Sequence, residues 1–139
     1  MLTLPATPAT LVLRTDFSDD RVWDAICQAS LAASPEGFMA ALSFVSDPAF
    51  AGLSVEQVAA LPSEARRSVL FLVDHVTVTH PERPLVAVDL HDEPGRWFRI
   101  VPAMMWGVEN NVAWNMFFRE FADAVDPDGV FRGFPGQRT

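Results

Sequence analysis

The chain of 139 residues is half apolar and has a net charge of −8 at pH 7, from 10 arginines, no lysine and 18 carboxylates. Its length and apolar content predict one folded domain over residues 1–139 and exclude a disordered chain. The acidic balance excludes nucleic-acid binding, because such a surface repels phosphate backbones, and no apolar run reaches the ~18 residues that cross a bilayer.

The first half of the chain predicts strands that alternate with helices. Residues 11–14 are typical of a short strand. Ser18 is the expected N-cap of a helix whose apolar stripe, with Cys27 on it, faces the core. Alternating apolar residues then predict a strand over 38–44. The stretch "SVEQ" at 54–57 is a capping box that opens a second, short helix.

The second half predicts three more strands and a last helix. The run "VLFLV" at 69–73 indicates a buried strand, and its alternation continues to residue 80. Two further strands, 84–90 and 96–101, are joined by a type II turn at Pro94-Gly95. Residues 108–114 fit either a strand or a helix, and Asn115 is the expected N-cap of the last helix. Together the elements predict an α+β domain with a mainly antiparallel sheet of about five strands and two or three helices packed on one face.

Several stretches of the chain carry a family resemblance. They are "LVLRTDFSDD", "DPAFAGLSVEQ", "VDLHDEPGRWFRIVP", "WGVENN" and "EFADAVDPDGVFRGF". They resemble a family of small bacterial proteins of actinobacterial type, domain of unknown function 6924. The resemblance covers nearly the whole chain but implies no activity or catalytic residue. The chain departs from the family pattern at His75, His80 and Trp97 and in "VAWNMFF". A weaker likeness, from the pattern N-x-x-F-x-E-F over 115–121, is to the SMI1/KNR4-type immunity domains.

The residue inventory restricts the possible chemistry. Without lysine there is no Schiff base and no ordinary P-loop, and without tyrosine there is no phenolic acid. Cys27 is the only cysteine, so no disulfide framework forms and a reducing, cytoplasmic location is expected. The N-terminus has neither the basic start nor the long apolar run of a signal peptide. We therefore expect no cofactor, and any chemistry to come from carboxylates, histidines, hydroxyls, arginines and amides.

Two Asp-His groups follow neighbouring predicted strands. If these strands pair, Asp89 and His91 share one strand face, and at most one of Asp74 and His75 joins them there. A carboxylate that holds an imidazole makes a general base near neutral pH. The alternative is that the aspartates are turn formers and the histidines are solvated. A metal site from the same residues is less favoured, and no metal is expected. Arg99 either clamps a ligand oxygen or forms an exposed ion pair.

A polar block, Glu109, Asn110 and Asn111, interrupts the most apolar segment, "MMWGVENNVAWNM". In one interpretation the two asparagines brace loose backbone groups before the last helix. In the other they bind substrate in a pocket with apolar walls, and Glu109 moves a proton. The walls would be Met104, Met105, Trp106, Trp114 and Met116.

Two functions fit these observations. The first is a cofactor-independent enzyme that uses acid/base chemistry on an apolar small molecule, as a lyase, isomerase or cyclase of natural-product biosynthesis. Its catalytic residues would be Glu109, His91, Asp89 and His75. The second is a non-enzymatic binding module, such as an immunity protein or adaptor, whose acidic face binds a basic protein partner. A homodimer is compatible with either function.

Overall fold

Six strands form one mixed sheet in the order β2-β1-β3-β4-β5-β6 in the computed structural model, which describes residues 1–112 and 114–136. β1 is parallel to both of its neighbours and β6 is parallel to β5, whereas β3-β4 and β4-β5 are antiparallel. The α+β class is confirmed, and the sheet is mixed rather than mainly antiparallel. The strands are β1 (Thr10–Arg14), β2 (Leu42–Val45), β3 (Val69–Val73), β4 (Leu85–Asp89), β5 (Trp97–Ile100) and β6 (Val130–Phe131).

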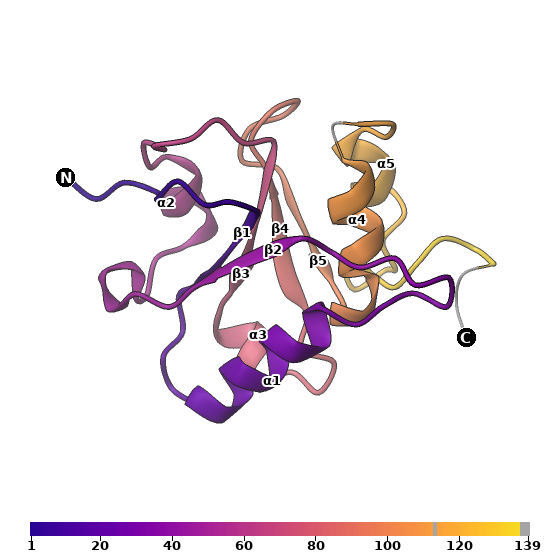
Figure 1. Ribbon diagram of the computed structural model, residues 1–139, viewed down its shortest axis with the longest axis horizontal. Helices are drawn as coiled ribbons and strands as arrows, with labels where there is room; N and C mark the ends of the chain where they lie inside the picture. The colour runs from indigo at the N-terminus through magenta and orange to yellow at the C-terminus, as the bar shows by residue number, and fades with distance from the viewer. Residues whose placement is uncertain (113, 137–139) are drawn as a thin grey trace.

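Short helices connect and cover these strands (Figure 1). They are α1 (Asp20–Ser30), α2 (Val55–Ala59), α3 (His75–Thr79), α4 (Met105–Asn111) and α5 (Phe118–Ala122), with 3-10 turns at Pro48–Phe50 and Pro102–Met104. The segment left open between strand and helix is therefore helical as far as Asn111, and Ala113 lies outside the described residues.

The sheet is covered on both faces, not on one as expected. The connection from β1 to β2 runs in one direction along the sheet, and the connection from β2 to β3 passes over β1 in the opposite direction. Right-handed crossovers in opposite directions place their helices on opposite faces. One face accordingly packs against α1, α4 and α5, with Ile26, Val108 and Phe121 in its core. The other packs against α2 and the N-terminal segment, with Val58 and Leu4. β3 and β4 are consequently buried along their whole length.

Local capping chemistry sets the helix starts. Asp19, not Ser18, is the N-cap of α1, because its carboxylate accepts the backbone N–H groups of the first turn at 3.0 and 3.1 Å. The predicted capping box of α2 is confirmed: the Ser54 hydroxyl accepts from Gln57 N–H, and the Gln57 amide oxygen accepts from Ser54 N–H. Each cap pairs donors that the first helical turn leaves without partners.

Three predicted elements differ in the structure. The alternating stretch after β3 is helix α3, because Asp74 caps it through the N–H and hydroxyl groups of Thr77. The strand predicted over 38–44 begins only at Leu42. The last helix begins at Phe118 with Phe117 as its N-cap residue, so Asn115 does not cap it.

The β4-β5 hairpin forms as predicted. The backbone N–H of Arg96 donates to the carbonyl of Glu93 at 2.9 Å across Pro94-Gly95. Gly95 has φ +93°, which the third position of a type II turn requires and which glycine adopts without steric cost. The hairpin places the 90–96 loop at one end of the sheet, beside the chain that leaves α4.

Candidate functional site

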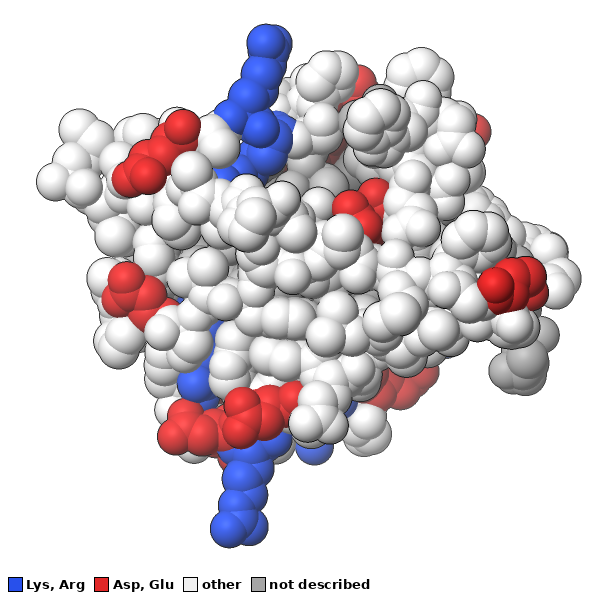
Figure 2. Space-filling view, viewed as in Figure 1, with Lys and Arg blue, Asp and Glu red and all other residues white. Residues whose placement is uncertain are grey.

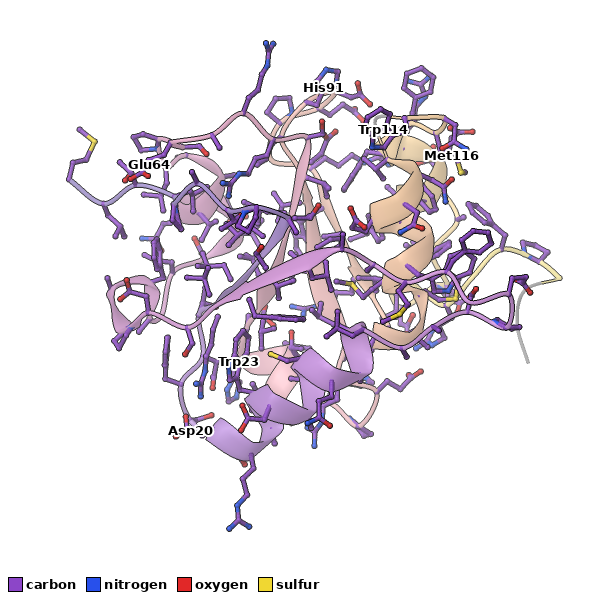
Figure 3. All side chains as sticks on the ribbon, viewed as in Figure 1. Asp20, Trp23, Glu64, His91, Trp114 and Met116 are labelled. Atoms are coloured by element: carbon purple, nitrogen blue, oxygen red, sulfur yellow. The ribbon has the colours of Figure 1, made fainter. Side chains whose placement is uncertain are left out.

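The two Asp-His groups lie at opposite ends of the sheet. β3 and β4 are antiparallel with Val69 paired to Asp89, so Asp74 and His75 follow the far end of β3. His91 lies with the hairpin loop at the other end of the molecule (Figure 3). The expectation that Asp74 or His75 lies beside Asp89 and His91 is wrong, because antiparallel neighbours finish at opposite ends of the sheet.

His75 lies in an exposed contact at the end of the sheet near α1. Its Nδ1 is 3.1 Å from the Asp16 carboxylate, and the imidazole is three-quarters exposed. Burial alone would raise the pKa of Asp16, but the hydrogen bonds from Ser18 and the contact with His75 hold that pKa below its usual value. The contact joins the loop after β1 to α3.

Asp89 is a buried turn former. Its side chain is 1% exposed, and its two oxygens accept the backbone N–H groups of His91, Asp92 and Glu93 at 2.9, 3.2 and 2.8 Å. A carboxylate with three such bonds holds the start of the 90–96 loop in place. The position of Asp89 gives it a role in the fold, and it reaches His91 through the backbone rather than through the imidazole.

Arg99 clamps a carboxylate of the protein itself. Its two terminal nitrogens lie 3.0 and 2.9 Å from the two oxygens of Asp74. Burial alone would raise the pKa of Asp74, but the bonds from Arg99 and Thr77 and the Arg99 charge keep it below its usual value. This fork joins β5 to the cap of α3.

The polar block of α4 braces the segment before β2. The Glu109 carboxylate accepts the backbone N–H of Ala41 at 2.7 Å and the hydroxyl of Thr10 at 3.1 Å. The Asn110 amide donates to the carbonyl of Met39 at 2.9 Å. These bonds explain why polar groups interrupt the apolar segment: they tie α4 to residues 39–41 and to β1.

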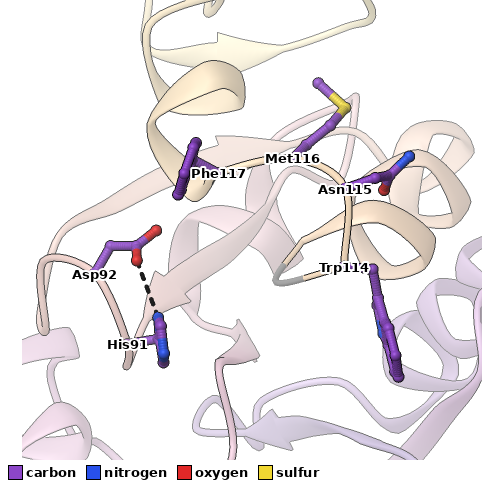
Figure 4. A pocket seen from close by; sticks show the side chains of 6 residues that line it. All are labelled: His91, Asp92, Trp114, Asn115, Met116 and Phe117. Carbon is purple, nitrogen blue, oxygen red and sulfur yellow. Dashed lines mark hydrogen bonds and ion pairs between the residues drawn. The ribbon is translucent and has the colours of Figure 1, made fainter.

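One candidate site is a groove at the hairpin end of the sheet, which we call the Trp114 groove. It consists of two cavities that share Trp114, a side chain with 87% exposure. The first cavity has a volume of about 260 Å³ and is drawn in Figure 4. His91 and Asp92 line it from the hairpin loop, with His91 Nδ1 2.9 Å from the Asp92 carboxylate. Its remaining lining residues are Asn115, Met116 and Phe117.

The second cavity of the Trp114 groove contains Glu109. It has a volume of about 270 Å³, and its lining includes Thr10 and Ser68 beside Glu109 and Trp114. No arginine among residues 1–112 and 114–136 forms an ion pair with Glu109, so only neutral donors meet this carboxylate. A negative charge on Glu109 would thus lie in the groove without a cationic partner in the described chain.

A separate apolar cavity, which we call the aromatic cavity, lies between α4, α5 and the C-terminal segment. Its volume is about 210 Å³. Trp106 is half-buried in its wall and stacks on Phe38 with ring centroids 6.1 Å apart. Asn111 and Gly107 contribute from α4, and the Asn111 amide donates to the Gly107 carbonyl at 2.6 Å. The other lining residues are Met104, Met116, Phe121, Phe131 and Phe134.

The other residues considered in the sequence lie outside the three cavities. Met105 is fully buried in the core, and Asn110 lines none of the three cavities. Burial and the neighbouring Asp24 charge raise the pKa of Cys27 to about 11, so its thiol is a poor nucleophile. The described residues contain no group of three or more His, Cys, Asp or Glu side chains placed for a metal ion. Within the same residues, no helix is both long and apolar enough to span a bilayer.

Sequence reasoning missed part of the lining. Asp92 follows His91 directly, and this adjacency was the available signal for their contact. Thr10 and Ser68 reach the Trp114 groove only because β1 and β3 are neighbours, which no local pattern indicates. The aromatic cavity combines α4 with residues that are distant in the sequence, such as Phe131.

Charge on the face over β2 and α4 is sparse. Figure 2 shows the middle of that face mostly uncharged, with acidic side chains standing singly there and gathered in a row over α1. A contact on this side of the molecule therefore depends on individual carboxylates and on apolar surface.

Comparison with known proteins identifies the family. The model of a domain of unknown function (DUF6924) matches residues 9–134. The chain belongs to this family. Searches of the curated proteins and of the solved structures gave no match. The match spans all six strands and both parts of the Trp114 groove.

Proposed function

We propose that this protein is a binding module that holds a short basic and apolar segment of a partner protein in the Trp114 groove. The observation that carries the proposal is the juxtaposition of Trp114, which is almost fully exposed, with a carboxylate that no described arginine pairs, Glu109. Tryptophan and other aromatic side chains are enriched at interaction sites, where a partner covers their apolar surface.

The two cavities of the groove have complementary chemistry. Beside Glu109, a guanidinium or ammonium group would meet a negative charge and the face of an indole, a combination that favours cations. On the other side of Trp114, Met116 and Phe117 offer apolar surface, with Phe117 half exposed. Methionine and aromatic side chains adapt to irregular apolar partners. A segment with an arginine next to an apolar residue fits both cavities at once.

The overall charge of −8 supports a basic partner. A negatively charged protein attracts a basic segment over a distance of one Debye length, which speeds association. The open shape of the groove suits a segment of a larger partner better than an enclosed substrate.

Titration with defined peptides tests the proposal. Short peptides that contain arginine and apolar residues are compared with peptides in which glutamate replaces arginine, and binding is measured by isothermal calorimetry. The arginine peptides should bind the protein, and Trp114→Ala and Glu109→Gln should each weaken them by about tenfold. Glu64→Gln, which removes the same charge on the other side of the molecule (Figure 3), should bind as the unmodified protein does.

Equal binding of arginine and glutamate peptides, or unchanged affinity in both groove variants, would contradict the proposal. Glutamine at position 109 can still accept from Ala41 N–H and donate to the Thr10 hydroxyl, so the variant should keep its fold. A melting curve on each variant verifies this.

A second function is favoured by one observation. His91 and Asp92 form an imidazole-carboxylate pair at 2.9 Å in the wall of a 260 Å³ cavity, which is the arrangement of a general base. The alternative is acid/base catalysis on an apolar small molecule bound between His91 and Phe117. Small molecules that raise the melting temperature would be incubated with the protein and followed by mass spectrometry. Conversion of a bound molecule to a product by the unmodified protein, lost in His91→Gln, supports catalysis. If every bound molecule is recovered unchanged, the catalytic alternative is wrong.

A further inference from the structure

We propose that the aromatic cavity is a second binding site, which takes a small planar aromatic molecule with one hydrogen-bond donor. This site is separate from the Trp114 groove, although Met116 lines both. Binding of a small molecule there would be a function additional to the binding of a partner segment in the Trp114 groove.

The size and walls of the cavity fit an aromatic ring. Its volume of about 210 Å³ exceeds the roughly 150 Å³ at which apolar cavities hold benzene. Trp106, Phe121, Phe131 and Phe134 supply ring faces and edges, and Met104 and Met116 supply flexible thioethers. Aromatic walls bind a planar ring by stacked and edge-to-face contacts, and thioethers fill the remaining space.

Gly107 is the second observation that points to a ligand. It is buried in the interior of α4 and has an ordinary helical backbone, so no positive φ requires glycine there. A Cβ on Gly107 would meet only Met104 Cε among the described residues, at an ordinary contact distance of 3.7 Å. Alanine is a better helix former than glycine, so the fold alone favours alanine at this position. The missing side chain leaves the floor of the cavity open.

Asn111 supplies the polar contact. Its amide nitrogen donates to the Gly107 carbonyl at 2.6 Å, which fixes the orientation of the amide. No described residue donates a hydrogen bond to its side-chain oxygen, and among the described residues that line the cavity Asn111 alone has an amide side chain. A half-buried acceptor in apolar walls selects a ligand that brings one donor, such as the N–H of an indole.

Indole and 1-methylindole are the probes for this site. Binding is followed by saturation-transfer NMR and by thermal shift with the unmodified protein, Gly107→Ala, Asn111→Ala and Trp114→Ala. Indole should bind saturably and raise the melting temperature. Gly107→Ala should melt at a higher temperature without ligand and bind indole about tenfold more weakly, because its methyl group occupies ligand space.

The remaining variants separate this site from its alternatives. The unmodified protein should prefer indole to 1-methylindole by about three- to tenfold, and Asn111→Ala should remove that preference. Trp114→Ala should bind indole normally while binding the arginine peptides about tenfold more weakly, so failure of one site is distinguishable from failure of the other.

Three results would overturn the proposal. The first is a linear, non-saturating response of the unmodified protein to indole. The second is equal indole affinity in Gly107→Ala. The third is a lower melting temperature of ligand-free Gly107→Ala, which would show that packing, not an open cavity, requires the glycine.

Discussion

Asp89 combines nearly complete burial with three backbone hydrogen bonds, and it shows how a polar residue can resemble a catalytic one in the sequence. Its oxygens accept from three successive N–H groups of the hairpin loop. In Asp89→Asn the amide NH₂ group would face one or two of these donors, leaving them unpaired. We expect the free energy of unfolding to fall by about 1–3 kcal/mol. Urea unfolding measures this, and unchanged stability would show that the loop does not depend on Asp89.

Asp74 predicts a specific dependence of stability on pH. Its pKa in the folded protein is lowered, mainly by Arg99 and against the effect of burial. The stability that the ionised Asp74 carboxylate contributes is therefore complete above its unfolded pKa of about 3.9. It is lost as the pH falls through the pKa of Asp74 in the folded protein. Asp74→Asn lacks this titration. The difference in unfolding free energy between the two proteins should be constant from neutral pH to about 5 and shrink below about 4. A difference that grows on acidification would contradict the assignment.

At the scale of elements, α4 connects the sheet to both candidate sites. Glu109 on this helix holds the backbone of Ala41 and the hydroxyl of Thr10. Glu109→Ala would leave both groups to water, so a loss of about 1 kcal/mol in unfolding free energy is expected. Glu109→Gln should lose much less, because its amide can serve the same partners. Equal losses in the two variants, measured by chemical denaturation, would mean that the charge and not the bonding stabilises α4.

Two features that depend on neighbouring residues alone were predicted correctly. They are the capping box at 54–57 and the turn at Pro94-Gly95, and both form. The stretch after β3 was predicted as a strand because "HVTVT" alternates and is β-branched, but the Asp74 cap turns it into α3. Which strand ends meet depends on the pairing directions, so the two Asp-His groups were placed together in error.

The residues of the two candidate sites also show that local sequence does not reveal contacts between distant segments. Trp106, Asn111 and Met116, which lie within one short segment of the sequence, line one cavity. The sequence could not separate the walls of two different cavities, because Trp114 and Trp106 occur in the same apolar run. Nor could it place Thr10 in the groove beside Glu109, since that contact spans 99 positions of the chain.

At the scale of the whole molecule, the net charge of −8 predicts how binding depends on salt. The attraction between this protein and a basic segment is long-ranged at low ionic strength. Raising the salt from about 0.01 to 1 M shortens the Debye length from about 30 to 3 Å. Arginine peptides should therefore bind more weakly and associate more slowly as salt increases, whereas indole binding should be unaffected or slightly stronger. Stopped-flow fluorescence measures the rates, and peptide binding that salt does not affect would point to purely apolar recognition.

The most direct measurement is a map of backbone amide chemical shifts during titration with an arginine and apolar peptide. We expect saturable shifts in the hairpin loop around His91, at Glu109 and around Trp114. The Asp16-His75 contact at the opposite end of the sheet should stay unperturbed. Shifts that concentrate around Asp16 and His75, or that never saturate, would contradict the assignment of the Trp114 groove as the binding site.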